Sequence, residues 1–561
     1  KTEDLWLYDV EVYPKLFLVC AKKYGVDEWI ILVNPTRFEV EDACRNPLVG
    51  FNNLRYDNHI MMGAITGENN MHLFQRSQAI INNEPGGMHS GAYGLSYLDI
   101  YEMATKKQSL KKWEVEMGID HMEMDIPWDE PVPEELIPKI IQYCKTDVIA
   151  SEAVFKDRGS DYDARLILSE LSGLPVNAKT QDHTAEIIFE GDRYAKSQFV
   201  YTDLATEFPG YTYEFGKSSY IGEDPSEGGL VREKLGIHSN VVLLDIESQH
   251  PKSIELLNFF GKYTKNFVAL RKARLAIKHK DYDKASRMFN GKLKPYLKEP
   301  AKAKALSYAL KIAINIVYGM TSAKFPNKFN MPENKDNIVA KRGSLFMLAL
   351  KQQLDIRDIE WCHFKTDSVK LVDPSEDDIE FVKEFGKQYG YTFAHEATYS
   401  RMALVTKADY IAQYAWSDEG DEKIGQWEVV GARFADPIVY KKIFSKEELT
   451  EEDYFLTKTA TAPIYLGEEF IGKVAKVYCS NSGQELDRVD HSKEKCGAVS
   501  GTKNYDWELA SRFKGLKDIN MEYYGKKVEA ALDMIAKVGR VSDIVDDIPS
   551  AFHKTDYDLP F

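Results

Sequence analysis

The sequence predicts a multidomain protein of the α/β class that combines helices with sheets. Three observations support this prediction. At about 150 residues per domain, 561 residues correspond to three or four domains. Strand-like and helical segments alternate along the chain. Hydrophobic residues make up 44% and charged residues 29% of the sequence, which is enough to form large buried cores. A single small module and a globally disordered chain are therefore excluded.

The periodicity of apolar residues predicts the elements in order. Residues 5–34 contain three strand-like runs rich in β-branched and aromatic residues. Apolar residues recur three or four apart over 133–156, which indicates a helix and an α/β domain that ends near residue 195. A glycine-rich, loop-like connector follows. The remaining elements are a buried strand at VVLLDIE, helices near 262–289 and 301–320, a strand–turn–strand at WCHFKTDSVKLV, and alternating helices and strands after residue 375.

Charge and cysteine content limit the partners and the compartment. The chain carries 72 basic and 88 acidic residues, a net charge of −16, which repels nucleic acid unless basic residues are concentrated locally. Residues 262–311 provide such a concentration, with 15 basic and 3 acidic residues. Six cysteines without a CxxC pair favour a reducing compartment. Without a signal peptide or a long apolar run, we expect a cytoplasmic protein with no membrane association.

A first group of carboxylates comes from three segments of the N-terminal region. Asp9 and Glu11 alternate on one strand, so both point to the same face. Asp57 follows in GFNNLRYDNHIM, and Tyr143 and Asp147 are i, i+4 neighbours on a helix. Four carboxylates that meet need cations between them. Two Mg²⁺ ions would activate a water molecule and stabilise a leaving oxygen, while the tyrosine orients that water.

A second group of residues has the chemistry of triphosphate binding. Asp245 ends a buried strand just before a proline-containing turn, and Asp367 lies at the tip of the strand–turn–strand. Lys311, Asn315 and Tyr318 share one helix face within the basic segment. The two acids could hold two Mg²⁺ ions while helix lysines neutralise phosphates during in-line attack by a hydroxyl group.

The first group resembles a known exonuclease family. The order D-x-E, N-x-x-Y-D and Y-x-x-x-D is similar to the three motifs of DEDDy proofreading 3′–5′ exonucleases. This resemblance implies a ribonuclease-H-like fold. It also implies that Asn53 contacts the frayed single strand, that Tyr143 positions the water, and that the metal ligands are Asp9, Glu11, Asp57 and Asp147.

The second group resembles motifs A, B and C of compact, phage- or virus-type family B DNA polymerases. The matching patterns are D-x-x-S-x-x-P-x-S-I, K-x-x-x-N-x-x-Y-G and T-D-S. The resemblance implies a right-hand fold of palm, fingers and thumb. It implies metal binding by Asp245, Asp367 and the Ile246 carbonyl, and nucleotide binding by Ser248, Lys311, Asn315 and Tyr318. Lys304, two turns before Lys311, is a second candidate for a phosphate-binding cation, and a solvated helix lysine is an equal alternative.

Several positions depart from the family pattern. His250 replaces the tyrosine that usually excludes the ribose 2′-hydroxyl, so we expect weaker discrimination against ribonucleotides. Lys365 replaces the first acid of the usual D-T-D, and we expect it to contact the primer backbone. Lys407 and Tyr410 have the spacing K-x-x-Y where the family usually has K-x-Y in its primer-binding segment.

The connector also departs from its family counterpart. SEGGL resembles the Y-x-G-G linker between exonuclease and palm, with Ser226 in place of the tyrosine. Gly228 and Gly229 would allow the backbone to approach template phosphates closely.

The resulting expectation is a DNA-directed DNA polymerase with a proofreading exonuclease. It would use Mg²⁺ or Mn²⁺, two ions per active site, with dNTPs as substrates and primer-template DNA as its partner. We expect a monomer in the host cytoplasm that replicates a phage or viral genome, with a helicase and a single-strand binding protein as candidate partners. The predicted domains are exonuclease (1–195), connector and first palm part (196–260), fingers (261–325), second palm part (326–400), and thumb with C-terminal region (401–561).

The spacing between the motifs bears on the kind of primer, and Lys365 bears on whether the polymerase half is active. Protein-primed relatives carry extra segments between these motifs, whereas only 66 residues separate Asp245 from Lys311 and 56 separate Lys311 from Asp367. The resemblance therefore implies a nucleic-acid primer rather than a protein primer. The alternative function is a DNA-binding 3′–5′ exonuclease whose polymerase half is disabled by Lys365. A sequence-specific DNA-binding protein without catalysis is disfavoured, because acids recur at each metal-ligand position.

Overall fold

The computed structural model describes the chain except for residues 120–123, 125, 490–494 and 548–561. The chain forms two compact units, each assembled from three separate stretches. Unit 1 consists of Lys1–Ile187, Ala273–Ala313 and Leu456–Phe513. Unit 2 consists of Ile188–Lys272, Ile314–Phe455 and Lys514–Phe561. Three helices cross the boundaries between these stretches: α8 (Thr180–Phe189), α10 (Thr264–Lys278) and α12 (Pro300–Thr321).

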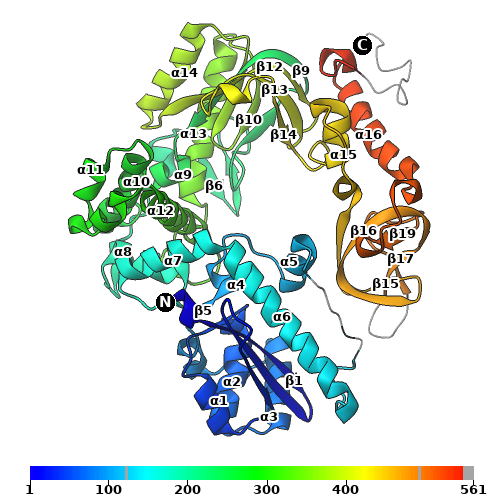
Figure 1. The fold of residues 1–561 in the computed structure, drawn as a ribbon. Helices are drawn as coiled ribbons and strands as arrows, with labels where there is room; N and C mark the ends of the chain where they lie inside the picture. Colours follow the sequence, from blue (N-terminus) through cyan, green and yellow to red (C-terminus); the bar gives the residue numbers. More distant parts are fainter. Residues whose placement is uncertain (120–123, 125, 490–494, 548–561) are drawn as a thin grey trace. The chain divides into compact units, whose positions relative to one another are not determined.

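The N-terminal part of unit 1 is built on a five-stranded sheet of order β3-β2-β1-β4-β5 (Figure 1). Strands β1 to β3 pair antiparallel, whereas β4 is parallel to β1 and β5 is parallel to β4. The strands are β1 (Trp6–Tyr13), β2 (Leu16–Lys23), β3 (Trp29–Val33), β4 (Leu48–Gly50) and β5 (Leu98–Asp99). The helices are α1 (Arg37–Ala43), α2 (Asp57–Ile65), α3 (Asn70–Ile81), α4 (Ile100–Met103), α5 (Leu110–Met117), α6 (Ile137–Asp157) and α7 (Gly159–Ser172).

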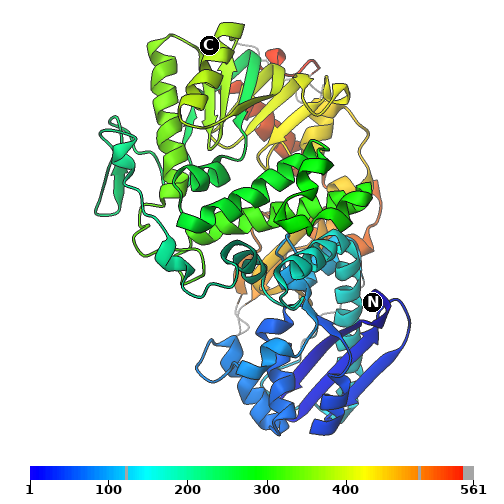
Figure 2. The ribbon, with the colours of Figure 1, turned by 90° about the vertical axis from the view of Figure 1, so that its left-hand side faces the viewer.

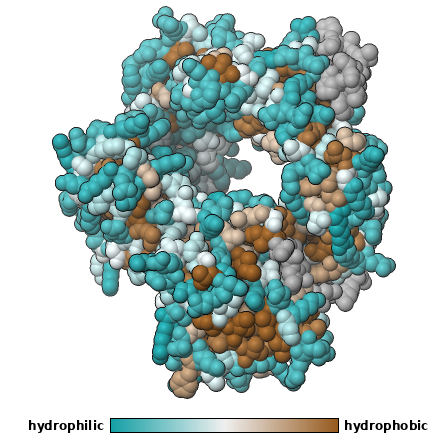
Figure 3. Space-filling view, viewed as in Figure 1, coloured by the Kyte–Doolittle hydropathy of each residue, from teal (hydrophilic) through white to brown (hydrophobic). Residues whose placement is uncertain are grey.

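Helices cover both faces of this sheet because β1 alternates its side chains between two cores. Tyr8 and Val10 pack with residues of α1 to α3, whereas Leu7 packs with Cys144 and other residues of α6. Asp9 therefore lies on the α6 face. At the edge of the sheet, Ile31 and Val33 of β3 are each 40% exposed, and Figure 3 shows an apolar area over this sheet.

The rest of unit 1 comes from later parts of the chain. Its second sheet is antiparallel, with the order β18-β17-β15-β16-β19. The strands are β15 (Leu456–Leu466), β16 (Glu469–Gln484), β17 (Leu486–Val489), β18 (Lys495–Ala498) and β19 (Trp507–Leu509). The short helix α11 (Tyr282–Ser286) belongs to the basic segment.

Unit 2 is built on an antiparallel seven-stranded sheet of order β14-β13-β12-β9-β11-β10-β8. Its strands are β8 (Val231–Glu233), β9 (Gly236–Ile246), β10 (Trp361–Lys365), β11 (Ser368–Val372), β12 (Phe393–Leu404), β13 (Tyr410–Ser417) and β14 (Trp427–Val430). Its helices are α9 (Gln249–Leu256), α13 (Ile338–Ile356), α14 (Glu376–Gln388), α15 (Pro437–Val439) and α16 (Met521–Ala536).

One face of the seven-stranded sheet is packed against α13 and α14. Phe346 of α13 lies 5.7 Å from Phe385 of α14 and 6.1 Å from Phe393 of β12, between ring centroids. Phe393 pairs with Ile246, whose neighbour Asp245 points to the opposite face. Asp245 therefore lies on the sheet face away from these two helices.

Most of the local predictions are confirmed. The three strands of residues 5–34, the helix over 133–156, the helix near 301–320 and the strand–turn–strand around Asp367 all form. The single helix predicted near 262–289 is wrong in part, because α10 ends at Lys278 and α11 begins at Tyr282, after Asp281 caps its N-terminus. The class, a multidomain protein with mixed helices and sheets, is confirmed too. The prediction of a loop-like connector was wrong in part, because β6 (Thr212–Glu214) and β7 (Lys217–Ser219) form a hairpin within it. In the described part of the chain, no helix combines the length and apolar character needed to cross a bilayer.

Candidate functional site

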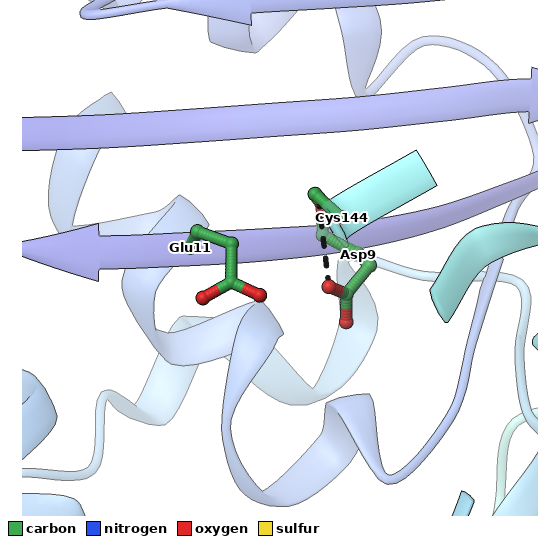
Figure 4. A group of neighbouring side chains, drawn as sticks. All are labelled: Asp9, Glu11 and Cys144. Atoms are coloured by element: carbon green, nitrogen blue, oxygen red, sulfur yellow. Dashed lines mark hydrogen bonds between the residues drawn. The ribbon is translucent and has the colours of Figure 1, made fainter. Parts of the chain in front are cut away.

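The first cluster begins with two carboxylates on β1. Asp9 and Glu11 lie two residues apart and point to the face covered by α6. Cys144 of α6 joins them, and one potential ligand atom from each of the three lies within 4.8 Å of the others. Figure 4 shows the Cys144 thiol donating to Asp9 Oδ2, at 3.5 Å from sulfur to oxygen. The strand and the helix together therefore place these three groups side by side.

Asp57 and Asp147 complete the first cluster. Asp57 is the first residue of α2, and its Oδ1 accepts a hydrogen bond from the Val10 amide at 3.3 Å. Burial, and next the negative charges of Asp57 and Asp147, hold the pKa of Asp9 well above its usual range. Burial also raises the pKa of Asp57 to about 7. The structure thus brings all four predicted carboxylates of this group together.

The donor set of this cluster fits a divalent cation. Carboxylates that raise each other's pKa are destabilised when all are ionised, and a hard cation relieves that repulsion. Asp9, Glu11, Asp57 and Asp147 offer only oxygen ligands, as Mg²⁺ or Mn²⁺ prefers. Divalent ions bound by these carboxylates would supply activation of a water molecule and stabilisation of a leaving oxygen.

Lys111 is a cluster residue that sequence reasoning missed. Its ammonium group forms a salt bridge with Asp147 and lies 4.4 Å from the ring centroid of Tyr143. Its charge lowers the pKa of Asp9 and Glu11, although burial outweighs it. No local signal marks this lysine, because it lies on α5, 36 residues before Asp147.

Asn53 lies buried beside the first cluster. Its amide nitrogen donates to Asn58 Oδ1 at 3.1 Å and to Ser96 Oγ at 2.7 Å. Asp99, which sequence reasoning missed, accepts hydrogen bonds from the backbone amides of Asn52 and Leu54, each at 3.0 Å. These bonds hold the loop before α2 in place, and a contact of Asn53 with DNA stays a prediction.

The second cluster lies at neighbouring strand ends in unit 2. Asp245 is the penultimate residue of β9 and pairs with Ser368 of β11, next to Asp367 in the β10–β11 turn. The Ile246 amide donates to the Asp367 carbonyl at 2.9 Å, which ties the two strand ends together. Burial and the charge of Asp367 raise the pKa of Asp245 to about 8. Two carboxylates that repel each other in this way also fit Mg²⁺ or Mn²⁺ as a ligand set.

Lys370 is a buried cation beside the second cluster that sequence reasoning missed. It is 2% exposed and follows Ser368 by two residues on β11, so it shares the Asp245 face. Its ammonium group lies 4.8 Å from the ring centroid of Tyr410, and its charge lowers the pKa of Asp245 and Asp367 against the larger effect of burial.

Lys365 pairs with Ser368 at the end of β10, and its contact with a primer stays a prediction.

Gly229 packs directly against the turn that carries Asp367. A Cβ atom on Gly229 would lie 2.8 Å from Thr366 Oγ1, closer than side chains tolerate. The Thr366 amide donates to the Leu230 carbonyl at 2.7 Å. Gly228 differs, because a Cβ atom there would meet nothing within 4 Å. One glycine of the pair therefore has a packing role, and an approach of either to template phosphates stays a prediction.

The predicted nucleotide-binding residues lie on two helices. Lys304, Lys311, Asn315 and Tyr318 belong to α12, with the lysines in the unit 1 part and the other two in the unit 2 part. The Tyr318 ring stacks on His250 of α9, with centroids 3.9 Å apart and planes 6° from parallel. Burial lowers the pKa of His250 to about 4, so this imidazole is neutral at pH 7.

Three other predicted residues lie near the second cluster. Ser248 precedes α9 with a left-handed backbone, at φ +57°. The Tyr410 hydroxyl donates to Glu428 at 3.0 Å, and its ring is 4% exposed. The Lys407 carbonyl lies 3.2 Å from His363 Nε2. Primer contacts by Lys407 and Tyr410 stay predictions.

Comparison with known proteins gave structural likenesses but no match by sequence. No protein-family model matches the sequence, and no curated protein does. A solved structure of the family B DNA polymerase from the hyperthermophilic archaeon Pyrobaculum calidifontis resembles the chain with a TM-score of 0.41 and 14% sequence identity. The match covers 95% of this chain and 78% of the other.

Proposed function

We propose that this protein is a template-directed DNA polymerase with a 3′–5′ proofreading exonuclease. The observation that carries the proposal is the presence of two separate carboxylate clusters, each at the position that its motif predicts. Asp245 and Asp367 meet in unit 2, where a backbone hydrogen bond of 2.9 Å joins their strand ends. Four carboxylates meet in unit 1, where burial and then neighbouring negative charges raise the pKa of Asp9 and of Asp57. Two such sites in one chain fit two metal-dependent reactions on phosphodiesters.

For synthesis, Asp245, Asp367 and the Ile246 carbonyl would hold two Mg²⁺ or Mn²⁺ ions. When bound, the ions would activate the primer 3′-hydroxyl group and neutralise charge on the triphosphate. Lys311, with Lys304 as a second cation, binds the phosphates of the incoming dNTP, and Ser248 lies under the triphosphate tail. Asn315, Tyr318 and His250 form the surface for the nascent base pair. Lys365, Lys407 and Tyr410 bind the primer strand, and Gly228 and Gly229 face the template.

For proofreading, the four carboxylates of unit 1 would hold two further ions. Tyr143 orients the attacking water, and Asn53 binds the frayed strand. Lys111 neutralises part of the carboxylate charge and holds Asp147 and the Tyr143 ring in place. Burial of these groups excludes bulk water and strengthens each electrostatic contact.

The proposed layout follows the motifs along the chain. The exonuclease, of ribonuclease-H-like fold, spans 1–195. The palm comprises 196–260 and 326–400, the fingers 261–325, and the thumb with the C-terminal region 401–561. The proposed setting is the host cytoplasm, where a monomer would copy a phage or viral genome from a nucleic-acid primer, with a helicase and a single-strand binding protein as partners.

The decisive experiment is extension of a labelled primer with four dNTPs and Mg²⁺. The unchanged chain should extend the primer and should degrade it when dNTPs are left out. Asp367→Asn should abolish extension and spare degradation, whereas Asp9→Asn should do the reverse, each by a factor of roughly a thousand or more. Loss of both activities in either single variant would contradict two independent sites.

A second candidate function is a DNA-binding 3′–5′ exonuclease with an inactive polymerase half. Lys370 favours it, because its charge acts on both carboxylates of unit 2 and opposes the binding of Mg²⁺, and Lys365 stands where the family usually has the first acid. Under this alternative the chain degrades the primer at every dNTP concentration. Net extension at any dNTP concentration rejects it.

A further inference from the structure

The β6–β7 hairpin of unit 2 has an aromatic side chain at its tip. Phe215 and Gly216 form the two-residue turn between the paired residues Glu214 and Lys217. The Phe215 side chain is fully exposed, at 102% of its reference area. In Figure 2 the hairpin, drawn in teal, projects from the rest of its unit. A ring that stays hydrated contributes no hydrophobic stabilisation to folding.

The backbone at this position is unfavourable for phenylalanine. Phe215 has φ +50° and Gly216 has φ +78°. Two-residue hairpin turns with both φ values positive favour Asn-Gly or Asp-Gly, and a bulky residue at the first position is strained. Neither packing nor backbone geometry therefore explains this side chain, and residues that folding does not explain are candidates for binding.

The base of the hairpin is fixed to the start of α13. The Tyr213 hydroxyl donates to the Lys335 carbonyl at 3.1 Å. The Lys341 ammonium donates to the Ser218 hydroxyl at 2.8 Å, and Lys341 is only 2% exposed. The tip is thus presented by an anchored hairpin, so little conformational freedom is lost when a partner binds.

The same anchor reaches the residues proposed to contact the base pair. Asn337, between Lys335 and Lys341, interacts with the hydroxyl group of Tyr318. Tyr318 stacks on His250, with 3.9 Å between their ring centroids. The hairpin and the proposed nucleotide site therefore both contact residues 335–341 of unit 2, and this connection favours nucleic acid as the partner.

We propose that Phe215 is a stacking platform for an unpaired nucleobase in the single-stranded template ahead of the polymerase site. Stacking on an aromatic ring suits this partner because every base has a π-face, so binding does not depend on sequence. The inference deepens the proposed function and rests on it for the identity of the strand.

The test uses the full chain and primer-templates with 5-iododeoxyuridine at successive positions of the template overhang. Light couples this base to an aromatic ring that stacks on it. We expect a photoproduct in the peptide that contains Phe215. Phe215→Leu should remove it and weaken binding of the overhang roughly tenfold, and Phe215→Tyr should retain both. Phe38→Leu, which alters a ring 66% exposed on α1, is the matched control.

A second variant separates binding from folding. Phe215→Asn relieves the turn, so its melting temperature should equal or exceed that of the unchanged chain while overhang binding falls as in Phe215→Leu. Overhang binding that is unchanged in both variants, or photoproducts that map elsewhere, would overturn the inference, as would a protein partner that binds through Phe215 without any effect on DNA. A chain that never extends a primer would overturn the proposed function instead. The two failures can be told apart because the photoproduct is measured without primer extension.

Discussion

At the scale of single residues, we expect His250 to set which sugars the proposed nucleotide site accepts. Its ring lies flat on Tyr318, only 3.9 Å away between centroids. Burial keeps the imidazole neutral by lowering its pKa to about 4. Its Nδ1 atom is buried and has no hydrogen-bond partner within the described residues. A neutral imidazole is smaller than a phenol and can form a hydrogen bond to a 2′-hydroxyl.

His250→Tyr should increase the preference for dNTPs over NTPs roughly tenfold, because the larger ring fills the space beside the sugar. The measurement is kcat/KM for one dNTP and the matching NTP on the same primer. His250→Phe is the control, since it adds ring volume without a hydroxyl group. Equal sugar selectivity in the unchanged chain and His250→Tyr would contradict the prediction.

Lys111 should matter for degradation alone. Lys111→Met removes the cation that binds Asp147 and lies 4.4 Å from the Tyr143 ring centroid. We expect the rate of degradation of single-stranded DNA to fall about tenfold or more, with primer extension within about twofold of normal. Lys112→Met is the matched control, because Lys112 is the next residue on α5 and interacts with Glu116 instead. Equal degradation by both variants would remove Lys111 from the site.

The buried carboxylates make the metal-free protein sensitive to pH. The pKa of Asp57 is raised to about 7 and that of Asp245 to about 8, against about 4 in an unfolded chain. The folded state therefore binds more protons than the unfolded state between these values, and stability falls as pH rises from about 4 to about 8.

Without metal, the melting temperature should be lower at pH 8 than at pH 5, and Mg²⁺ should raise it more at pH 8. Calorimetry with a chelator and then with Mg²⁺ measures both effects. The double variant Asp57→Asn and Asp245→Asn should reduce the pH dependence, which assigns it to these groups. A metal-free melting temperature that increases across this interval would contradict the prediction.

At the scale of elements, the fit of the connector against the β10–β11 turn sets the position of Asp367. Thr366 has φ +55°, and its amide bonds to the Leu230 carbonyl. Gly229 leaves room for the Thr366 side chain, whereas Gly228 lies beside open space. The same substitution at each of these two adjacent glycines therefore separates an effect of packing from an effect of backbone flexibility.

Gly229→Ala should lower the free energy of unfolding by about 1–3 kcal/mol and slow extension about tenfold, because the new methyl group displaces the turn. Gly228→Ala should change both by much less. Denaturant unfolding and single-turnover extension measure the two effects, and degradation of single-stranded DNA reports whether unit 1 is intact. Equal effects of the two substitutions would show that the contact with Thr366 does not matter.

At the scale of the whole molecule, we expect the uneven distribution of charge to govern the proposed binding of DNA. The chain has a net charge of −16, yet residues 262–311 contain 15 basic and 3 acidic residues. Raising the salt from about 50 to about 200 mM should weaken primer-template binding on the order of a thousandfold, as expected for six or more phosphate contacts. Fluorescence anisotropy measures this, with an uncharged phosphonate backbone as the control. A salt-independent affinity would place the DNA away from the basic segment.

The sequence by itself determined the elements whose pattern is local. Alternation placed Asp9 and Glu11 on one face of β1, and helical spacing placed Tyr143 and Asp147 together on α6. The motif order was sufficient to name the acids that meet in each cluster. The β6–β7 hairpin was missed because its strands are three residues each within a glycine-rich connector.

Only the tertiary structure decided which cations and glycines surround these acids. Lys111 reaches Asp147 through the packing of α5 on α6, and Lys370 reaches Asp245 through the pairing of β11 with β9. Gly229 meets Thr366 across 137 residues of chain. Such contacts depend on strand register and helix packing between distant segments, which no local periodicity encodes.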